Sequence, residues 1–170
     1  MRRIVSNATP LIYLAKIERL DLLRKVFDEV IIPEEVSREA VDTGKKLKVR
    51  DAFIIGQAIQ EGWLRVRKAR MITSPIKLDT GELAVISLAK QMGVKEVLID
   101  ETPARTAAKL VGLEARGTIF VLLRALEEKL IDLEGFLESM GKLIESGFRL
   151  REEIYVEAIR NARRIVRTRR

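Results

Sequence analysis

Acidic and amide side chains fall at positions from which they could act together. Asn7 and the pair Asp100-Glu101 directly follow expected strands, Glu82 stands in the first turn of an expected helix, and Glu39 lies in the helix after the second expected strand. The chain has no histidine and no cysteine, so any metal must be held by oxygen. Oxygen ligands favour Mg²⁺ or Mn²⁺, and clustered carboxylates need such a cation to offset their repulsion. Metal-assisted hydrolysis of a phosphodiester fits these residues better than other reactions do.

The elements that would position these residues follow an α/β pattern. Short β-type runs alternate with longer helix-type runs, as in βαβ units around a parallel sheet. Strands are expected over residues 3–6, 29–32, 64–66, 97–99 and 113–115. Helices are expected over residues 11–16, 19–27, 34–41, 49–61, 79–90, 103–110, 118–129, 132–145 and 150–165. Thr9 is expected to cap the first helix ahead of Pro10, residues 42–46 to form an exposed loop, and residues 68–78 a long connection.

This arrangement would bring the candidate residues to one rim of the sheet. Ligands of an open parallel sheet bind outside the carboxyl ends of its strands. Asn7 directly follows the first expected strand and Asp100 follows the fourth, so they would meet if these strands are neighbours. A helix beginning at Asp79 would carry Glu82 to the same rim. The interior of that helix is apolar almost all round, which indicates burial on most faces.

Each candidate also has a purely structural explanation. The run Asp79-Thr80-Gly81-Glu82 has the form of a capping box, with Asp in place of Ser or Thr. Asp100 could cap the following helix, Glu39 could be a solvated helix residue, and Asn7 could fix a turn. Taken singly these residues favour the structural explanation, whereas their convergence on one rim favours a functional one.

Positive charge is concentrated at the C-terminal end of the chain. The formal net charge is +7, and residues 141–170 hold nine Lys or Arg and four Glu. Residues 160–170 contain six arginines and no acid. Such a stretch suits a polyanion, because neutralising phosphates releases condensed counterions. A solvated, salt-bridged helix is the alternative.

The composition predicts one globular domain over residues 1–170, with a basic helix from about 150 to 170. Hydrophobic residues make up 47% and charged residues 34%, which is a globular balance. No apolar run approaches the ~20 residues that span a bilayer, and the apolar stretch at the N-terminus is too short for an export signal. A cytoplasmic protein that does not bind membranes is therefore expected.

A series of short motifs, in their order and spacing, resembles the PIN domain family. The motifs are Val5 to Ile12 (VSNATPLI), Ile31 to Val36 (IIPEEV) with Glu39, Leu78 to Ala84 (LDTGELA), Leu98 to Glu101 (LIDE) with Arg105, and Gly117 to Leu123 (GTIFVLL). The resemblance covers almost the whole chain and is closest to a prokaryotic branch related to toxin-type PIN ribonucleases.

The resemblance implies a three-layer Rossmann-like fold with a central parallel sheet flanked by helices. It also implies a metal-dependent ribonuclease of the kind found as the toxin in toxin–antitoxin pairs. The implied metal site comprises Asn7, Glu39, Glu82 and one or both of Asp100 and Glu101, and the acids expected to be catalytic are Glu39, Glu82 and Asp100. The residues expected to contact nucleic acid are Arg105, Arg160, Arg163, Arg164 and Arg167.

Two positions depart from the family pattern. The first acid is normally aspartate, and here it is Asn7; an amide oxygen can ligate a hard cation but brings no negative charge. The Thr or Ser that usually precedes the fourth acid is replaced by Ile99. Both departures bear on catalytic rate more than on the fold.

The sequence leaves three functions open. The first is an Mg²⁺- or Mn²⁺-dependent endoribonuclease. The second is a nucleic-acid-binding or regulatory module that has lost catalysis, suggested by Asn7 and the arginine-rich end. The third is a protein-interaction subunit, as a homodimer; an antitoxin protein is a further expected partner. Other nucleotide-handling classes are disfavoured, because the chain has no glycine-rich phosphate motif and no histidine for a Ser-His-Asp triad.

Overall fold

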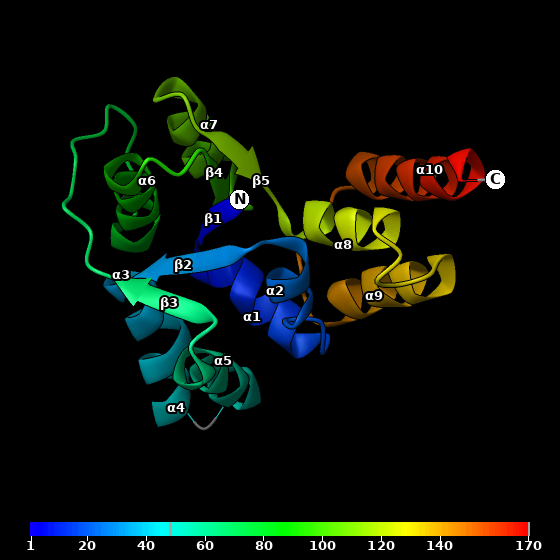
Figure 1. Ribbon diagram of the computed structural model, residues 1–170, viewed down its shortest axis with the longest axis horizontal. Coiled ribbons are helices and arrows are strands. Elements are labelled where there is room, and N and C mark those ends of the chain that lie inside the picture. The colour runs from blue at the N-terminus through cyan, green and yellow to red at the C-terminus, as the bar shows by residue number, and fades with distance from the viewer. Residues whose placement is uncertain (48, 170) are drawn as a thin grey trace.

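A five-stranded parallel sheet forms the centre of the computed structural model, which describes residues 1–47 and 49–169 (Figure 1). Its strands are β1 (Arg3–Ser6), β2 (Glu29–Pro33), β3 (Leu64–Arg67), β4 (Glu96–Leu98) and β5 (Glu114–Arg116). Their spatial order is β3-β2-β1-β4-β5, and every neighbouring pair is parallel. The chain therefore builds outward from β1 through β2 and β3, and then returns to the other side of β1 with β4 and β5.

The three central strands consist of apolar residues because both of their faces are covered. Val5 of β1 lies opposite Ile31 of β2 on one side and Val97 of β4 on the other, and all three are fully buried. Helices α1 (Ala8–Lys16), α2 (Leu22–Val26) and α5 (Arg50–Glu61) lie on one side of the sheet, and α6 (Thr80–Met92) and α7 (Thr102–Leu110) lie on the other (Figure 1). These layers confirm the predicted α/β fold with a parallel sheet between helices.

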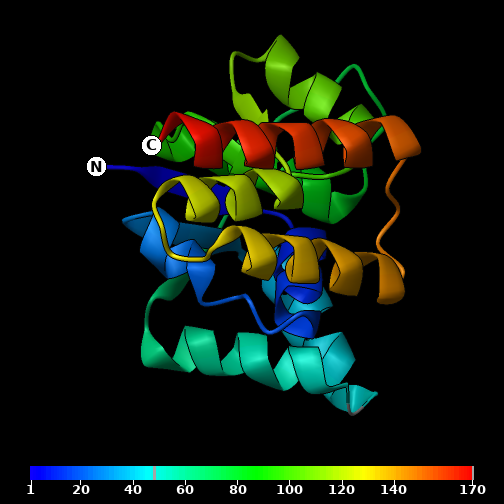
Figure 2. The ribbon, with the colours of Figure 1, turned by 90° about the vertical axis from the view of Figure 1, so that its right-hand side faces the viewer.

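The last three helices stand side by side at one end of the molecule. They are α8 (Thr118–Glu127), α9 (Leu133–Glu145) and α10 (Glu152–Thr168), and Figure 2 shows α8 between the other two. Helix α10 packs through Ala158 and Ala162, whose small side chains allow close approach. The predicted basic helix is therefore present, although Arg170 lies outside the described residues. No described helix has the length and apolarity needed to cross a membrane.

Two predictions of local structure were wrong. Residues 42–46 do not form a loop: Asp42 ends the π-helical turn η1 (Arg38–Asp42), which continues α3 (Glu34–Ser37), and the next four residues form α4 (Thr43–Lys46). Gly44 is needed there because a Cβ at this position would collide with the Cβ of Ala52 in α5, so this glycine permits two helices to touch.

The cap of α1 is Asn7, not Thr9. Pro10 lies in the first turn of that helix, where the missing N–H group would have had no intrahelical partner in any case. The other predicted elements are present, with ends that differ by at most a few residues.

Candidate active site at the carboxyl edge of the sheet

The order of the strands creates a crevice between the carboxyl ends of β1 and β4. At this point the chain direction across the sheet reverses, and open α/β sheets bind ligands at such a switch point. The backbone N–H of Asn7 donates to the carbonyl of Leu98 (2.9 Å), which ties the end of β1 to the end of β4. The residues that follow these two strands therefore share one edge.

Three oxygen atoms face a small space beside Gly81. A Cβ added at Gly81 would lie 3.1 Å from Oε2 of Glu39, 3.5 Å from Oδ1 of Asp79 and 3.6 Å from Oδ1 of Asn7. Asn7 occupies the N-cap position of α1, but its side chain makes no capping hydrogen bond, so the amide oxygen remains available to this space. Only 5% of Asn7 is exposed, so it lies at the bottom of the crevice.

Asp79 and Glu82 are held by the start of α6. Oδ1 of Asp79 accepts the backbone N–H of Glu82 (2.7 Å), and Oε1 of Glu82 accepts the backbone N–H of Asp79 (3.1 Å). The predicted capping box is therefore confirmed. Glu82 is 9% exposed, whereas Asp79 is open to solvent, so one carboxylate lies in the wall and the other at the rim.

Glu39 projects from η1, a π-helical turn, and its side chain is exposed. Wide turns of this type are rare and often occur at functional sites. The turn shifts the helical register between α3 and α4, and Glu39 at its start reaches the space beside Gly81.

The adjacent acids Asp100 and Glu101 have different surroundings. Both oxygens of Asp100 accept hydrogen bonds from Thr118, one from the backbone N–H (2.8 Å) and one from Oγ1 (2.7 Å). Asp100 therefore fixes the start of α8. Glu101 is exposed, makes no capping hydrogen bond to α7, and accepts a hydrogen bond from Thr9 Oγ1 (2.9 Å). Arg105 donates to the carbonyls of Ile99 (2.8 Å) and Ala115 (3.3 Å), which places its guanidinium at the ends of β4 and β5.

The electrostatics of the crevice are those of crowded like charges. Partial burial of its carboxylate raises the pKa of Glu39, and the charges of Asp79 and Glu101 add to that increase. Burial also raises the pKa of Glu82; the backbone hydrogen bond from Asp79 opposes the increase, and the charges of Asp79 and Glu101 reinforce it. Glu101 thus acts on carboxylates from two other elements. We call Glu39, Asp79, Glu82 and Glu101, together with Asn7, the acidic cluster.

For Asp100, burial is again the main reason that the pKa rises. The two hydrogen bonds from Thr118 and the charge of Arg105 lower it, and the charge of Glu101 raises it, with a net increase. A charged Asp100 is therefore costly to the fold despite its hydrogen bonds.

The donor atoms of the acidic cluster suit a hard divalent cation. They are carboxylate and amide oxygens, and a cation would relieve the repulsion that raises the pKa values of Glu39 and Glu82. Within residues 1–47 and 49–169, however, no three acidic side chains are already close enough to share an ion. The converging set consists of one amide and two carboxylates around Gly81; the side chain of Asp79 is held by the capping box, whereas the exposed side chain of Glu39 is free to adjust.

Hollows lie on both sides of the acidic cluster. One of about 440 Å³ is lined by residues that include Arg38, Glu39 and Asp79. The other, of about 930 Å³, is lined by residues that include Asp100, Glu101 and Arg105. A chain-like substrate could therefore extend in both directions from the cluster.

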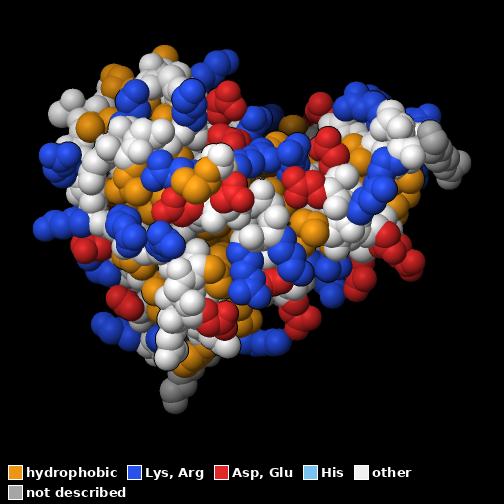
Figure 3. Space-filling view, viewed as in Figure 1, with side chains coloured by type: hydrophobic (Ala, Val, Ile, Leu, Met, Phe, Trp, Pro, Cys, Tyr) orange, Lys and Arg blue, Asp and Glu red, His pale blue; other side chains and the backbone are white. Residues whose placement is uncertain are grey.

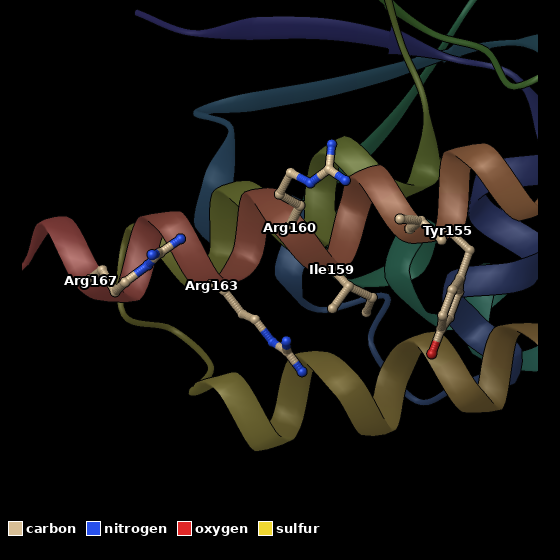
Figure 4. A pocket seen from close by; sticks show the side chains of 6 residues that line it. Tyr155, Ile159, Arg160, Arg163 and Arg167 are labelled. Atoms are coloured by element: carbon tan, nitrogen blue, oxygen red, sulfur yellow. The ribbon is translucent and has the colours of Figure 1, made fainter.

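The basic face of α10 lies apart from the acidic cluster, on the outer side of the C-terminal helices. Arg160, Arg163, Arg164 and Arg167 are exposed, and in the part of the chain that the structure describes none of them forms an ion pair. Figure 3 shows basic side chains on the lobe that α10 forms, with acidic ones among them. In Figure 4, Tyr155, Ile159 and Arg163 extend toward the neighbouring helix and Arg160 points to the other side, around a shallow hollow of about 390 Å³.

The structure thus gathers four of the sequence-predicted site residues in one crevice, and the arginines of α10 lie apart from them. Asn7, Glu39, Glu82 and Glu101 come together, whereas Asp100 and Arg105 are engaged in hydrogen bonds at the neighbouring strand ends. Asp79 was predicted as a helix cap and missed as a site residue. Asp79 follows the predicted connection over residues 68–78 and stands three residues before Glu82, and this spacing indicated a helix cap. Nothing in the local sequence showed that the carboxylate of Asp79 also approaches Glu39.

The parallel sheet, with acidic side chains at its switch point, defines an open α/β protein of the class that binds ligands at the carboxyl edge of the sheet. Within this class, a family model described as PIN domain matches residues 3–164, so the chain belongs to the PIN domain family. No curated protein matches the chain. Family membership confirms the resemblance that the motifs of the sequence indicated.

Proposed function

We propose that this protein is a divalent-cation-dependent endoribonuclease whose active site is the acidic cluster. The observation that carries the proposal is the convergence of Asn7, Glu39 and Asp79 oxygens beside Gly81 at the switch point of the sheet. Glu82 and Glu101 supply further negative charge to the same crevice. With oxygen as the only ligand type, Mg²⁺ or Mn²⁺ is the expected cofactor.

The residues of the cluster have separate roles in this proposal. Asn7, Glu39, Glu82 and Glu101 would hold the cation, with Asp79 beside them. A divalent cation, when bound, would neutralise these carboxylates and polarise the phosphate that is to be cleaved. Glu39 is exposed at the rim of the crevice, where its carboxylate could contact water beside the cation. The sequence suggested Asp100 as a catalytic residue; in this proposal its role is structural, because it holds the start of α8 through two hydrogen bonds from Thr118.

The variant Glu82→Gln tests this proposal without removing the helix cap. Glutamine keeps the oxygen that accepts from the Asp79 N–H, and it serves in capping boxes as glutamate does. We expect the fold to be retained and RNA cleavage in Mg²⁺ or Mn²⁺ to fall by about 10²-fold, the upper range for losing a group that tunes a metal site. Glu134→Gln is the matched control, because Glu134 is an exposed glutamate in the first turn of α9.

The proposal would be wrong if wild-type protein cleaved RNA with neither Mg²⁺ nor Mn²⁺, or if it cleaved RNA equally well in EDTA. Equal cleavage by wild type and Glu82→Gln would remove this carboxylate from the site. Melting temperatures of both variants show whether any loss reflects unfolding.

A second candidate is a nucleic-acid-binding module with little or no catalysis. It is favoured by Asn7, which lacks the charge of the usual aspartate, and by the exposed arginines of α10, which form no ion pair within the described chain. Replacing Arg163, Arg164 and Arg167 with glutamine is expected to lower the slope of log Kd against log salt by about 0.7–0.9 for each phosphate that is no longer neutralised. A slope that does not change would exclude the basic face of α10 from the binding surface.

A protein partner, either an antitoxin or a second copy of the chain, is a further proposal. Exposed apolar side chains on α9 and α10 support it, namely Leu137, Ile144, Ile154 and Val156. Light scattering coupled to size-exclusion chromatography would detect a homodimer. If the protein is a monomer at all concentrations tested, the homodimer is excluded and only a different protein, such as an antitoxin, remains as the partner.

A further inference from the structure

The larger hollow beside the acidic cluster has walls of three chemical kinds. It measures about 930 Å³, within the range of small-molecule sites, and we call it the aromatic hollow. Thr9 and Glu101 line it on the side of the acidic cluster, Tyr13 and Phe148 supply aromatic rings, and Arg149 and Arg151 supply positive charge. The α9–α10 connection, which carries three of these residues, lies on the opposite side of the molecule from the N-terminus (Figure 2), the side to which β1 runs.

The end of α9 places Phe148 in this hollow. Gly147 has φ +91°, a left-handed conformation that glycine adopts without strain. The N–H of Phe148 donates to the carbonyl of Leu143 (3.0 Å), as in a Schellman ending of a helix. After this ending, residues 147–151 line the hollow together with Glu101, which follows β4 at the carboxyl edge of the sheet.

Helix α1 holds the connection against the site. Thr9 and Tyr13 are four residues apart and therefore lie on one face of α1. Thr9 donates to Glu101 of the acidic cluster, while the hydroxyl of Tyr13 donates to the carbonyl of Gly147 (3.3 Å). The rings of Tyr13 and Phe148 meet edge to face with centroids 5.1 Å apart. The helix that begins at Asn7 thus joins the acidic cluster to the aromatic rings.

Charged side chains of both signs line the hollow. Arg149 and Arg151 are exposed, and within the described residues neither forms an ion pair. Glu101 is part of the acidic cluster, since its charge raises the pKa of both Glu39 and Glu82. A ligand in the hollow would meet the aromatic rings of Tyr13 and Phe148, the cationic side chains of Arg149 and Arg151, and Glu101 of the acidic cluster.

We propose that the aromatic hollow binds one unpaired nucleotide of a single-stranded nucleic acid, next to the phosphate that is cleaved. Its base packs against Phe148 and Tyr13, and its backbone runs along Arg149 and Arg151. A paired base has no free face, whereas a splayed base can stack on an aromatic side chain. The inference rests on the proposed function for the position of the cleaved phosphate, and it extends that function by naming the residues that would hold the neighbouring base.

Binding without cleavage tests the aromatic hollow apart from the nuclease activity. Labelled hexauridylate is titrated in EDTA at low salt and followed by fluorescence anisotropy, alongside hexamers with one abasic position. Stacking of a base on an aromatic side chain contributes about 1–3 kcal/mol, so losing it should raise Kd by about 5- to 150-fold. We expect Phe148→Ala to show this loss and to bind intact and abasic hexamers equally.

Controls separate stacking from folding and from general charge. Phe148→Leu keeps an apolar side chain under the connection and should still lose discrimination against the abasic hexamer. Phe53→Ala removes an exposed ring on α5 and should bind as wild type does. Arg149→Gln should lower the salt slope by about 0.7, whereas Lys95→Gln, at the amino edge of the sheet, should not.

The outcomes are distinct for the two proposals. If Phe148→Ala remains folded and binds hexauridylate as tightly as wild type, or if wild type does not bind it, the aromatic hollow is not a nucleotide site. If binding behaves as expected but no cleavage occurs in Mg²⁺ or Mn²⁺, the nuclease proposal fails alone. A parallel titration with hexadeoxyuridylate measures the contribution of the 2′-hydroxyl groups to binding. A duplex that binds as tightly as the single strand would overturn the proposal that the hollow holds an unpaired base.

Discussion

Replacing Gly81 with alanine should separate the stability of the protein from its capacity to bind a cation. The new methyl group would lie in the space that the oxygens of Asn7, Glu39 and Asp79 face, only 3.1 Å from Oε2 of Glu39. The nearest atom belongs to an exposed, flexible side chain, which can move by the few tenths of an ångström required. The substitution therefore blocks the site while leaving the fold intact.

The two effects of Gly81→Ala have opposite signs. Alanine in a helix is favoured over glycine by up to about 1 kcal/mol, so the metal-free variant should melt at or slightly above the wild-type temperature. A cation at 100 times its Kd stabilises the wild type by about 2.7 kcal/mol. For a chain of this size that corresponds to about 5–10 °C in melting temperature. The variant should lose most of this increase and also lose cleavage.

Thermal melts in EDTA and in rising Mn²⁺ measure both effects, and Gly141→Ala provides the control. Gly141 lies inside α9 with no atom within 4 Å of an added Cβ, so this variant should gain stability and keep the full response to Mn²⁺. A Gly81→Ala protein that keeps the wild-type response to Mn²⁺ would refute the assignment of the cation to this space. A variant that melts far below wild type in EDTA would refute the view that Glu39 can move aside.

Three further predictions concern individual side chains. Because the folded-state pKa of Glu82 is raised above 4.5, the stability that it contributes is present below pH 4.5 and is lost as pH rises through the raised pKa. In EDTA, the melting temperature of Glu82→Gln should therefore rise relative to wild type as pH increases from 4.5 through the raised pKa, and a difference that stays constant with pH would contradict this. Asp100→Ala removes the two oxygens that accept hydrogen bonds from the buried Thr118, and it should lower the free energy of unfolding in urea by about 1–3 kcal/mol. A decrease below about 0.5 kcal/mol would show that Asp100 does not hold the start of α8. Asn7→Asp adds a buried charge, so it should lower the free energy of unfolding in EDTA by at least about 1 kcal/mol and increase RNA cleavage in Mn²⁺. If neither the free energy of unfolding nor the cleavage rate changes, Asn7 does not belong to the site.

The fold and the rim of the site could be predicted because they depend on local patterns. Apolar runs such as the one around Val97, alternating with helical periodicity, are sufficient to indicate a parallel sheet. The carboxyl ends of such strands then meet at one edge, which indicated the neighbourhood of Asn7 and Glu82. The capping box at Asp79 was readable for the same reason, because both of its hydrogen bonds lie within four residues.

The parts that could not be predicted depend on contacts between distant segments. The different surroundings of Asp100 and Glu101 are one example, because Thr118, which donates to both oxygens of Asp100, lies 18 residues further along the chain. Likewise, Gly44 looked like a loop glycine because its neighbour Ala52 is in another helix. The Tyr13–Phe148 contact joins residues 135 positions apart, and no local pattern indicates it.

The amide at position 7 is understandable from the charges around it. Asn7 is the most buried member of the cluster, and Glu39 and Glu82 already have raised pKa values because burial and like charges act on them together. A carboxylate at this depth would add a desolvation cost that the exposed rim residues do not bear. Compared with an aspartate at position 7, an amide keeps the oxygen in place and leaves the metal-free fold more stable, but it binds a cation less strongly. In the proposed nuclease, Asn7 therefore lowers the affinity for the cation and raises the stability of the metal-free fold, and the charge that attracts the cation must come from the carboxylates of Glu39, Asp79, Glu82 and Glu101.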